Sequence, residues 1–328
     1  MITTAQFRDL VKNAYVQWNK ARMEFPSVRS QIAVIENSME QSPEYSRMSS
    51  VPTARRQTEG NNAWKGTLKQ DYLKTFAQTK IALQVDVTEK MRLFDKYGEI
   101  MTQMRGMGRG VSRRMEQDIA SLLYNAWSTT LLNIDGETVS TATPDGLALI
   151  DNAHTVNGGS QTFSNEIDTT HSPIDQNVLE KLEEKFNTML DSADGRRVPI
   201  TPDTIITSSH APTVHMVERI LGSEYYTENA NMSKNTTRKY KHLVVPLLNT
   251  NPNTEQVDTT RNRYCFLAAL QNQDFNGFRM VMAQGENFVP PEQVFESGTW
   301  GFQSGAWYDF GTLFANFIAG TKGDGSLV

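Results

Sequence analysis

The fold of this chain is decided by residues 81–127, which read IALQVDVTEKMRLFDKYGEIMTQMRGMGRGVSRRMEQDIASLLYNAW. The first seven residues alternate strictly between apolar and other side chains. The apolar positions are Ile81, Leu83, Val85 and Val87. Because successive side chains point to opposite faces of a β-strand, this alternation predicts a strand with one buried face. Thr88 follows, and its hydroxyl can accept a hydrogen bond from the free amides at a helix start.

Beyond Thr88 the apolar period becomes helical. Apolar residues then recur every three or four positions, at Leu93, Tyr97, Ile100, Met104, Val111, Met115, Ile119, Leu122 and Ala126. This spacing predicts a long helix, which glycines interrupt at Gly98, Gly106, Gly108 and Gly110. A glycine inside a helix costs about 1 kcal/mol relative to alanine. The pattern favours a helix that must bend between two states, and two helices joined by a glycine loop are the alternative.

Composition indicates a folded protein with much extended surface. The chain has 328 residues, of which 38% are hydrophobic, and its mean hydropathy is -0.49. These values are low for a compact enzyme and high for a disordered chain. The formal net charge is -5, but residues 1–130 carry about +6 and the remainder about -11. Opposite charges in the two halves suit copies that pack half against half.

The only cysteine, Cys265, lies in an apolar run, so a buried thiol without a disulfide is expected. The first eight residues lack the features of a secretory signal. No apolar stretch reaches the roughly 20 residues that span a bilayer. Synthesis and folding in a cytoplasm are therefore expected.

A polar, basic arm precedes the alternating strand. Residues 3–24 are predicted to form a helix, and residues 46–80 to form a long hairpin around the turn signal at residues 59–62. This hairpin has too few apolar residues to form a core of its own. Trp64 and Tyr72 favour its contact with a neighbouring molecule.

The second half of the chain mixes helices and strands. Residues 131–173 read as a long irregular loop, residues 174–191 as a helix, and Pro212 begins a short helix. Strands are predicted at 242–248, 264–270, 278–282 and 306–318. The fold class is therefore α+β.

No catalytic constellation is present in the sequence. There is no phosphate-binding glycine loop and no nucleophile elbow. His210 and His215 lie five positions apart, which does not place them on one helix face. His154 has Asp151 nearby, so a hydrolytic or metal site is a remote alternative to a structural histidine. We expect no enzymatic activity, no cofactor and no metal site.

Two motifs carry a resemblance to a known family. Residues 145–149, Asp-Gly-Leu-Ala-Leu, are followed by His154, Gly158-Gly159 and Asn165. Residues 113–120, Arg-Arg-Met-Glu-Gln-Asp-Ile-Ala, lie on the predicted long helix. With the order of arm, hairpin, long helix and α+β region, the chain resembles the major capsid proteins of tailed bacteriophages. These proteins share the Hong Kong-type fold, and both motifs resemble its Mu-like branch. The resemblance to the family extends from about Tyr45 to Ile318.

The resemblance implies a division of the chain into five parts. These are an N-arm (1–44), an extended E-loop (45–90), a P domain with a spine helix and a loop region (91–175), an A domain (176–290) and a C-terminal return to the P domain (291–328). It implies a major capsid protein that self-assembles from hexamers and pentamers into an icosahedral shell around double-stranded DNA. The expected partners are copies of itself and separate scaffold, portal and decoration proteins, with assembly in the bacterial cytoplasm and no membrane. An encapsulin-type compartment that holds a cargo protein is the alternative.

The resemblance also assigns roles to residues. Inter-subunit contacts are expected in the E-loop at Arg55, Arg56, Trp64, Lys65 and Lys69, and a hinge of the spine helix at Gly106, Gly108 and Gly110. Some members link subunits through lysine and asparagine side chains, but this sequence does not establish such chemistry. Alanine at all three hinge glycines is expected to stabilise a straight helix by about 1 kcal/mol at each position.

Overall fold

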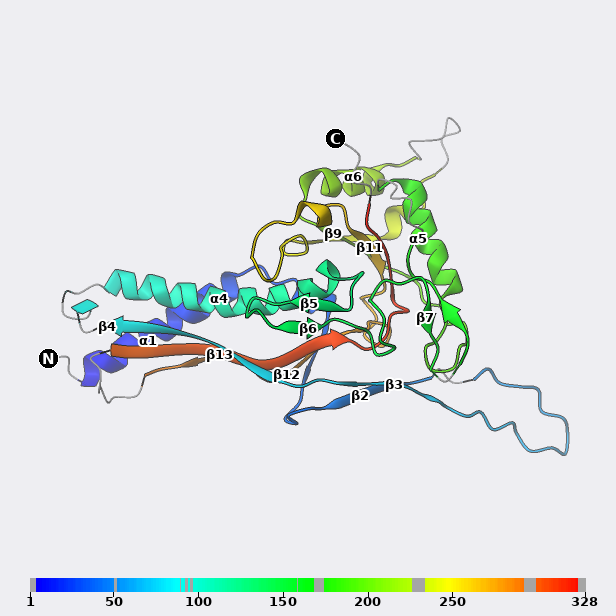
Figure 1. Cartoon of the computed structure of the whole chain (residues 1–328), viewed down its shortest axis with the longest axis horizontal. Coiled ribbons are helices and arrows are strands. Elements are labelled where there is room, and N and C mark those ends of the chain that lie inside the picture. The colour runs from blue at the N-terminus through cyan, green and yellow to red at the C-terminus, as the bar shows by residue number, and fades with distance from the viewer. Residues whose placement is uncertain are drawn as a thin grey trace.

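The computed structural model describes residues 4–49, 52–88, 90–91, 94, 97–157, 159–167, 174–225, 234–291 and 299–323. The molecule is elongated and has three recognisable parts (Figure 1). Two long helices and a long sheet form one end. A second sheet with its own helices stands above the middle, and a thin arm projects at the opposite end.

The long sheet has the strand order β1-β12-β13-β4. Its strands are β1 (Val34–Asn37), β12 (Phe278–Val289), β13 (Thr299–Thr312) and β4 (Thr79–Thr88). β12, β13 and β4 are antiparallel neighbours, whereas β1 is parallel to β12. The predicted alternating strand is thus confirmed as β4. The strand predicted at 306–318 is partly wrong, because β13 ends at Thr312 and Ile318 begins another strand.

Two long helices cover one face of this sheet. They are α1 (Thr4–Glu24) and α4 (Tyr97–Tyr124). Leu10, Ala14 and Trp18 recur every four residues on the buried side of α1, as a helix packed along its length requires. They form a cluster with Val87, Phe302 and the first half of α4.

The long helix is continuous through its glycines, so the alternative of two helices joined by a loop is wrong. The Thr88 hydroxyl accepts a hydrogen bond from the Met91 amide at 3.3 Å, as predicted for a helix start. The long helix itself begins only at Tyr97. Leu93, which the pattern assigned to it, lies outside the described residues.

The second sheet has the order β10-β9-β11-β14. Its strands are β10 (Lys241–Val245), β9 (Thr204–Ser208), β11 (Cys265–Ala268) and β14 (Ile318–Thr321). Helices α5 (Gln176–Thr188) and α6 (Ala211–Gly222) pack against it. The Asp175 side chain caps α5 by accepting from the Val178 amide at 2.7 Å. Cys265 is buried as expected, and burial raises the pKa of its thiol to about 12.

The remaining elements are short. They are α2 (Arg29–Ile32), β2 (Glu44–Met48), β3 (Gln70–Thr75), β5 (Thr130–Leu132), β6 (Thr138–Ser140), β7 (His154–Thr155), β8 (Thr162–Phe163) and the 3-10 turns η1 (Thr237–Lys239) and η2 (Thr259–Arg261). The region predicted as an irregular loop therefore contains two small hairpins, β5–β6 and β7–β8.

A common core joins the two sheets. The second half of α4 contributes Met115, Ile119 and Leu123, which pack with Phe266 of the second sheet and Met280 of the long sheet. The two sheets do not follow the expected domain boundary at residue 290. β12 precedes that boundary but belongs to the long sheet, and β14 follows it but belongs to the second sheet. The boundaries themselves stay a prediction.

Candidate assembly surface

The arm is the most exposed part of the described chain. β2 and β3 pair at its base, and every residue from 53 to 70 is exposed. Its tip turns at residues 58–61, where the Asn61 amide donates to the Thr58 carbonyl at 3.1 Å. Gly60 has φ +85°, a value that glycine adopts without strain. The arm therefore has local turn structure but no core.

The base of the arm is fastened to its own subunit. The Tyr72 hydroxyl lies 3.0 Å from the Thr155 hydroxyl, and the Lys74 ammonium donates to the Ala142 carbonyl at 3.1 Å. The Ser192 hydroxyl donates to Asp71, a buried carboxylate. Burial raises the pKa of Asp71, although this hydrogen bond opposes the shift. Contacts within the subunit thus set the direction of the arm at its base, whereas residues 53–70 of the arm are exposed.

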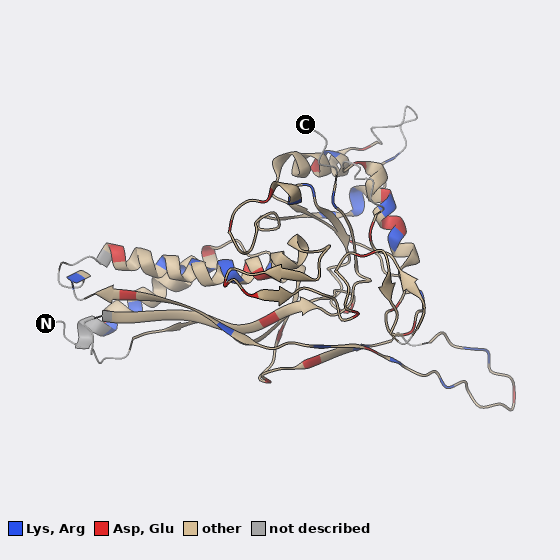
Figure 2. Cartoon of the chain, viewed as in Figure 1, with Lys and Arg blue, Asp and Glu red and all other residues tan. Residues whose placement is uncertain are grey.

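The predicted contact residues gather on the arm. They are Arg55, Arg56, Trp64, Lys65 and Lys69, all exposed. The Arg55 guanidinium lies 4.4 Å from the centre of the Trp64 ring. A cation over an indole face is attracted by the ring electrons, which holds the two extended limbs of the hairpin together. Figure 2 shows Lys and Arg spaced along both limbs.

The predicted hinge glycines lie on α4, away from the arm, and differ in surroundings. A Cβ at Gly106 would meet nothing within 4 Å. A Cβ at Gly108 would lie 2.5 Å from the backbone oxygen of Trp18. One at Gly110 would lie 3.1 Å from a methyl group of Leu83, a flexible side chain. The structure therefore explains Gly108 as the point where α1 crosses α4 too closely for a side chain. For Gly108 this overturns the expectation that alanine stabilises.

Sequence reasoning missed a buried ionic cluster behind this crossing. Glu286 on β12 accepts from Arg22, Arg29 and Ser112 at 3.0, 3.0 and 2.8 Å. Its side chain is 6% exposed. Because a buried carboxylate requires charged or hydrogen-bonding partners, this glutamate fixes α1, the segment after it and α4 to one strand. No spacing in the sequence signals contacts between residues more than 170 positions apart.

A second carboxylate fastens the same segment. Glu116, on α4, accepts from the Ser27 hydroxyl at 2.5 Å and from the amides of Val28 and Arg29 at 3.0 Å each. It thereby satisfies the free amides at the start of α2 from a distant helix. Glu116 lies in the motif 113–120, but nothing in that motif predicts this role.

Asp118 of the same motif is also buried. It accepts from Arg114 at 3.0 Å and from the Tyr308 hydroxyl at 2.5 Å. Burial raises the pKa of Asp118, and the Arg114 charge opposes that shift. Arg114 also reaches Asp135 beside the β5–β6 hairpin at 2.9 Å. The motif residues therefore join α4 to its surroundings.

His154 has a structural position. It is fully buried, and its Nδ1 lies 2.8 Å from a carboxylate oxygen of Asp145. The sequence had suggested Asp151 as its partner, because Asp151 is closer along the chain. Burial would raise the pKa of Asp145, but hydrogen bonds from His154 and Thr143 outweigh it and lower the pKa. Among the described residues, no group of three histidine, cysteine or acidic side chains is placed to hold a metal.

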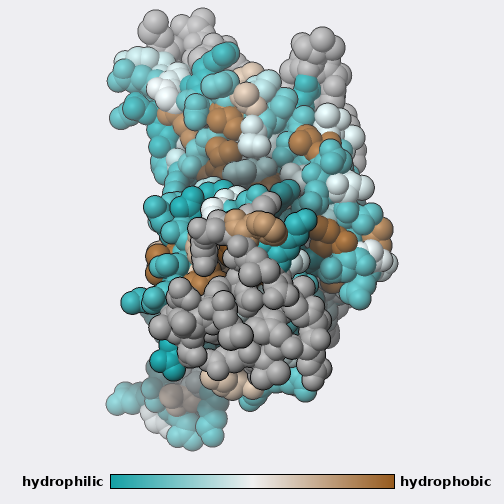
Figure 3. All heavy atoms as spheres, turned by 90° about the vertical axis from the view of Figure 1, so that its left-hand side faces the viewer, coloured by the Kyte–Doolittle hydropathy of each residue, from teal (hydrophilic) through white to brown (hydrophobic). Residues whose placement is uncertain are grey.

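Apolar side chains are also exposed away from the arm. Tyr15, Val16, Leu83 and Trp307 are each more than 40% exposed. Figure 3 looks at the end of the molecule opposite the arm and shows hydrophobic residues in separate patches among hydrophilic ones. Small separate patches favour several modest contacts over one large interface.

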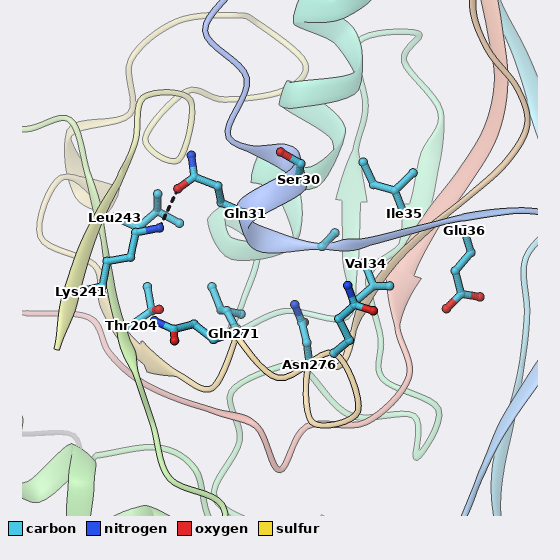
Figure 4. Close-up of a pocket in the computed structure, with 13 residues that line it drawn as sticks. Ser30, Gln31, Val34, Ile35, Glu36, Thr204, Lys241, Leu243, Gln271 and Asn276 are labelled. Atoms are coloured by element: carbon cyan, nitrogen blue, oxygen red, sulfur yellow. Dashed lines mark hydrogen bonds between the residues drawn. The ribbon is translucent and has the colours of Figure 1, made fainter. Parts of the chain in front are cut away.

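A cleft of about 590 Å³ lies where β1 faces the second sheet (Figure 4). Its walls are mainly polar, and the Lys241 ammonium spans it to reach Gln31 at 2.9 Å. The walls include one acidic side chain, Glu36, which pairs with Arg279 at 3.1 Å. The acidic side chain of the cleft is therefore held in an ion pair. In the part of the chain described, no helix is long and apolar enough to cross a membrane.

The chain is similar to known proteins in both sequence and fold. The model of a family described as phage capsid protein matches residues 72–323. No curated protein matches the sequence. Among solved structures, the chain is similar to the procapsid of bacteriophage JBD30, with 14% identity and a TM-score of 0.53, covering 98% of this chain and 77% of that one.

Two further capsids show the same likeness. The capsid of cyanophage P-SCSP1u has 9% identity and a TM-score of 0.54, with 90% of this chain and 87% of that chain covered. The capsid of Myoviridae phage XM1 has 10% identity and a TM-score of 0.50, with 92% and 93% covered. At such identities the likeness shows the fold alone, and the expected Hong Kong-type capsid fold is confirmed.

Proposed function

The chain belongs to the phage capsid protein family, and from this premise we propose that its arm, residues 52–69, joins neighbouring subunits of the shell. The protein is a structural subunit of the virion capsid, which forms icosahedral head shells. The proposal concerns how its copies hold together. The contact residues would be Arg55, Arg56, Trp64, Lys65 and Lys69.

The exposure of residues 53–70 carries this proposal. Fixing the backbone of one residue costs roughly 1–2 kcal/mol, and burial normally offsets that cost. The arm buries none of these residues in its own subunit, yet its base is fastened by Asp71, Tyr72 and Lys74. Burial of the arm against another copy of the protein would offset the entropic cost of fixing its backbone.

Charge indicates the kind of surface that receives the arm. Four cations and Glu59 are the charged residues between positions 52 and 70, so the tip carries about +3. The chain beyond residue 130 is acidic by about -11. Exposed ion pairs contribute at most about 1 kcal/mol each, but a shell repeats every contact in each subunit. We therefore infer an acidic acceptor on a neighbouring copy.

We also propose the finer organisation expected from the sequence. Its parts are an N-arm (1–44), an E-loop (45–90), a P domain (91–175), an A domain (176–290) and a C-terminal return (291–328). Hexamers and pentamers would enclose double-stranded DNA with the help of separate scaffold, portal and decoration proteins. Membership of the Mu-like branch rests on the sequence motif that contains Asp145 and His154. An experimental capsid map in which residues 143–165 failed to superimpose on a Mu-like head protein would refute that membership.

A hinge in α4 is proposed near Gly106. Alanine is accommodated there, so glycine is not required by packing. Its remaining physical effect is to weaken the helix locally, which favours bending. Gly108 and Gly110 would assist, although both also contact neighbouring elements.

Deleting residues 53–68 and closing the gap with a short Gly-Ser turn tests the arm. The deletion keeps β2, β3 and the bonds of Asp71 and Tyr72, so the subunit should remain soluble and give an unchanged circular dichroism spectrum in the helical region. Electron micrographs should show no closed shells. The matched control replaces Lys90, which lies outside the arm, with glutamine and should assemble normally. Shells of ordinary size from the deletion variant would refute the proposal.

The contents of wild-type particles separate the phage shell from the encapsulin alternative. Nuclease-protected double-stranded DNA supports the phage shell. A stoichiometric cargo protein without DNA would support a compartment instead.

A further inference from the structure

Two rows of exposed cations lie on the helical side of the long sheet. On α1 they are Arg8, Lys12 and Lys20, and on α4 they are Arg105, Arg109 and Arg113. The helices lie side by side, since Arg105 donates to Gln17 at 2.7 Å and Arg109 pairs with Glu24 at 3.7 Å. Figure 2 shows Lys and Arg recurring along α4. We call these six residues the helical basic face.

Few carboxylates compensate this face. Glu24 lies near Arg109 and near Lys20, and Glu255 near Arg113, at 3.7, 3.8 and 3.4 Å. All five side chains are at least 40% exposed. Exposed pairs at such distances are worth little, so the cations are available to another partner.

The remaining cations of the helical basic face have fewer acidic neighbours still. Within the described residues, Arg8, Lys12 and Arg105 make no ion pair with a carboxylate. The acidic residues on the two helices' exposed sides are Asp9, Glu24 and Glu99. The face is therefore positive although the chain has a net charge of -5.

The opposite side of the sheet differs. Its exposed charged residues on β4 are Lys80 and Asp86, which balance each other. Trp307 of β13 lies beside Lys80, at 6.0 Å from its ammonium. Among the described residues of α1, α4 and β4, the excess of positive charge therefore lies on the helical side of the sheet.

We propose that the helical basic face binds the phosphate backbone of double-stranded DNA, which makes it the inward side of the shell. Four residues of α-helix rise about 6 Å, so Arg105, Arg109 and Arg113 follow one another at that spacing along α4. On α1, Arg8 and Lys12 have the same spacing and Lys20 lies two such intervals further on. Duplex DNA carries one charge per roughly 1.7 Å of its axis, so these cations meet phosphates in any register. Such binding does not depend on base sequence. The inference rests on the proposed function, because it assumes that the shell encloses DNA.

Binding of purified full-length protein to a fluorescein-labelled 30-base-pair duplex tests the inference without shell assembly. The test variant is K12Q/R105Q, because neither residue pairs with a carboxylate and no acid is left unpaired. The matched control R55Q/R56Q removes the same charge from the arm. Anisotropy titrations between 50 and 200 mM salt give log K against log salt. For K12Q/R105Q we expect a slope less steep by about 1.8, since each lost phosphate contact removes about 0.9.

The binding measurements test the contact between the helical basic face and DNA independently of shell formation. An unchanged slope for K12Q/R105Q would overturn the inference, and so would an equal change in R55Q/R56Q. Poly-L-glutamate serves as a second probe. If K12Q/R105Q lost affinity for this acidic polypeptide and not for DNA, the face would be a protein-binding surface and the inference would be wrong. Absence of wild-type shells in micrographs would instead count against the proposed function.

Discussion

Gly106→Ala and Gly108→Ala should have opposite effects on stability, although the two positions lie two residues apart in the same helix. At Gly106 the new methyl group enters open space. At Gly108 it would lie 2.5 Å from the Trp18 carbonyl oxygen and 3.2 Å from an atom of the Trp18 ring. That oxygen belongs to the backbone of α1, so it cannot move without shifting the helix. The contrast therefore tests whether α1 rests on α4 as described.

The magnitudes follow from three terms. Alanine in place of glycine inside a helix gains about 1 kcal/mol, so Gly106→Ala should raise the free energy of unfolding by about that amount. Gly108→Ala gains the same term, but overpacking costs about 1–3 kcal/mol. Displacing α1 also strains the hydrogen bond from the Trp18 indole to Ser304, now 2.9 Å long. That bond is worth about 1 kcal/mol. The gain is common to both variants and cancels, so the two should differ by about 2–4 kcal/mol, the sum of the other two terms.

Urea unfolding of the unassembled subunit at fixed protein concentration measures this difference. Gly98→Ala is the matched control, because Gly98 is also in α4 and a Cβ there meets nothing within 4 Å. Equal stability of Gly106→Ala and Gly108→Ala would refute the close crossing of α1 and α4. Destabilisation by Gly106→Ala would refute a continuous helix at that position. If α4 also bends between two states, as proposed, Gly106→Ala should slow the change between those states while leaving the fold intact.

Three further predictions concern other parts of the subunit. Glu286→Gln should lower the free energy of unfolding by about 3 kcal/mol, because it leaves Arg22 without a buried carboxylate and Arg29 with only the more distant Glu116 at 3.7 Å, whereas the exposed Glu24→Gln should change it by less than about 1 kcal/mol. Equal losses in urea unfolding would contradict this. The pKa of Asp145 is lowered in the folded state, so its stabilisation is present above the unfolded value of about 4 and disappears as pH falls through the folded pKa; the difference in stability between wild type and Asp145→Asn should be full above about pH 4 and shrink as pH falls from there through the folded pKa. A constant difference across pH would show that the carboxylate charge is irrelevant. The double variant R55E/R56E should fail to form empty shells near 0.15 M salt, and wild-type arm contacts should weaken as the screening length falls to about 3 Å at 1 M. Normal empty shells that lose only their DNA would place these arginines on DNA instead.

Local patterns in the sequence were sufficient for β4, for α1 and for the arm, but not for the short hairpins β5–β6 and β7–β8 or for the end of β13. The alternation from Ile81 to Val87 is a property of one strand, and the helical spacing of α1 is a property of one helix. Residues 46–80 have too few apolar side chains to form a core, which predicts an arm, and residues 53–70 are exposed accordingly. Each of these inferences depends on side chains within one element, so a single sequence contains the necessary information.

Partners across long distances were not predictable in this way. Asp151 is closer in sequence to His154 than Asp145 is, yet its carboxylate accepts from the Ala153 amide at 2.9 Å and leaves the histidine to Asp145. The reason for Gly108 required knowing where α1 crosses α4. In each case the deciding contact is made by the tertiary arrangement and has no fixed spacing along the chain.

The distribution of buried charge explains why the arm is suited to assembly. Glu286 and Glu116 stabilise the interior of each subunit with buried, low-exposure ion pairs and hydrogen bonds, which salt screens weakly. Arg55 and Arg56 are exposed, so their contacts respond to salt and to neighbouring charge. Subunit folding and subunit association therefore depend on different groups of charges. A weak contact at the arm can be made and remade during assembly without unfolding the subunit, and its repetition around the shell supplies the stability that one contact lacks.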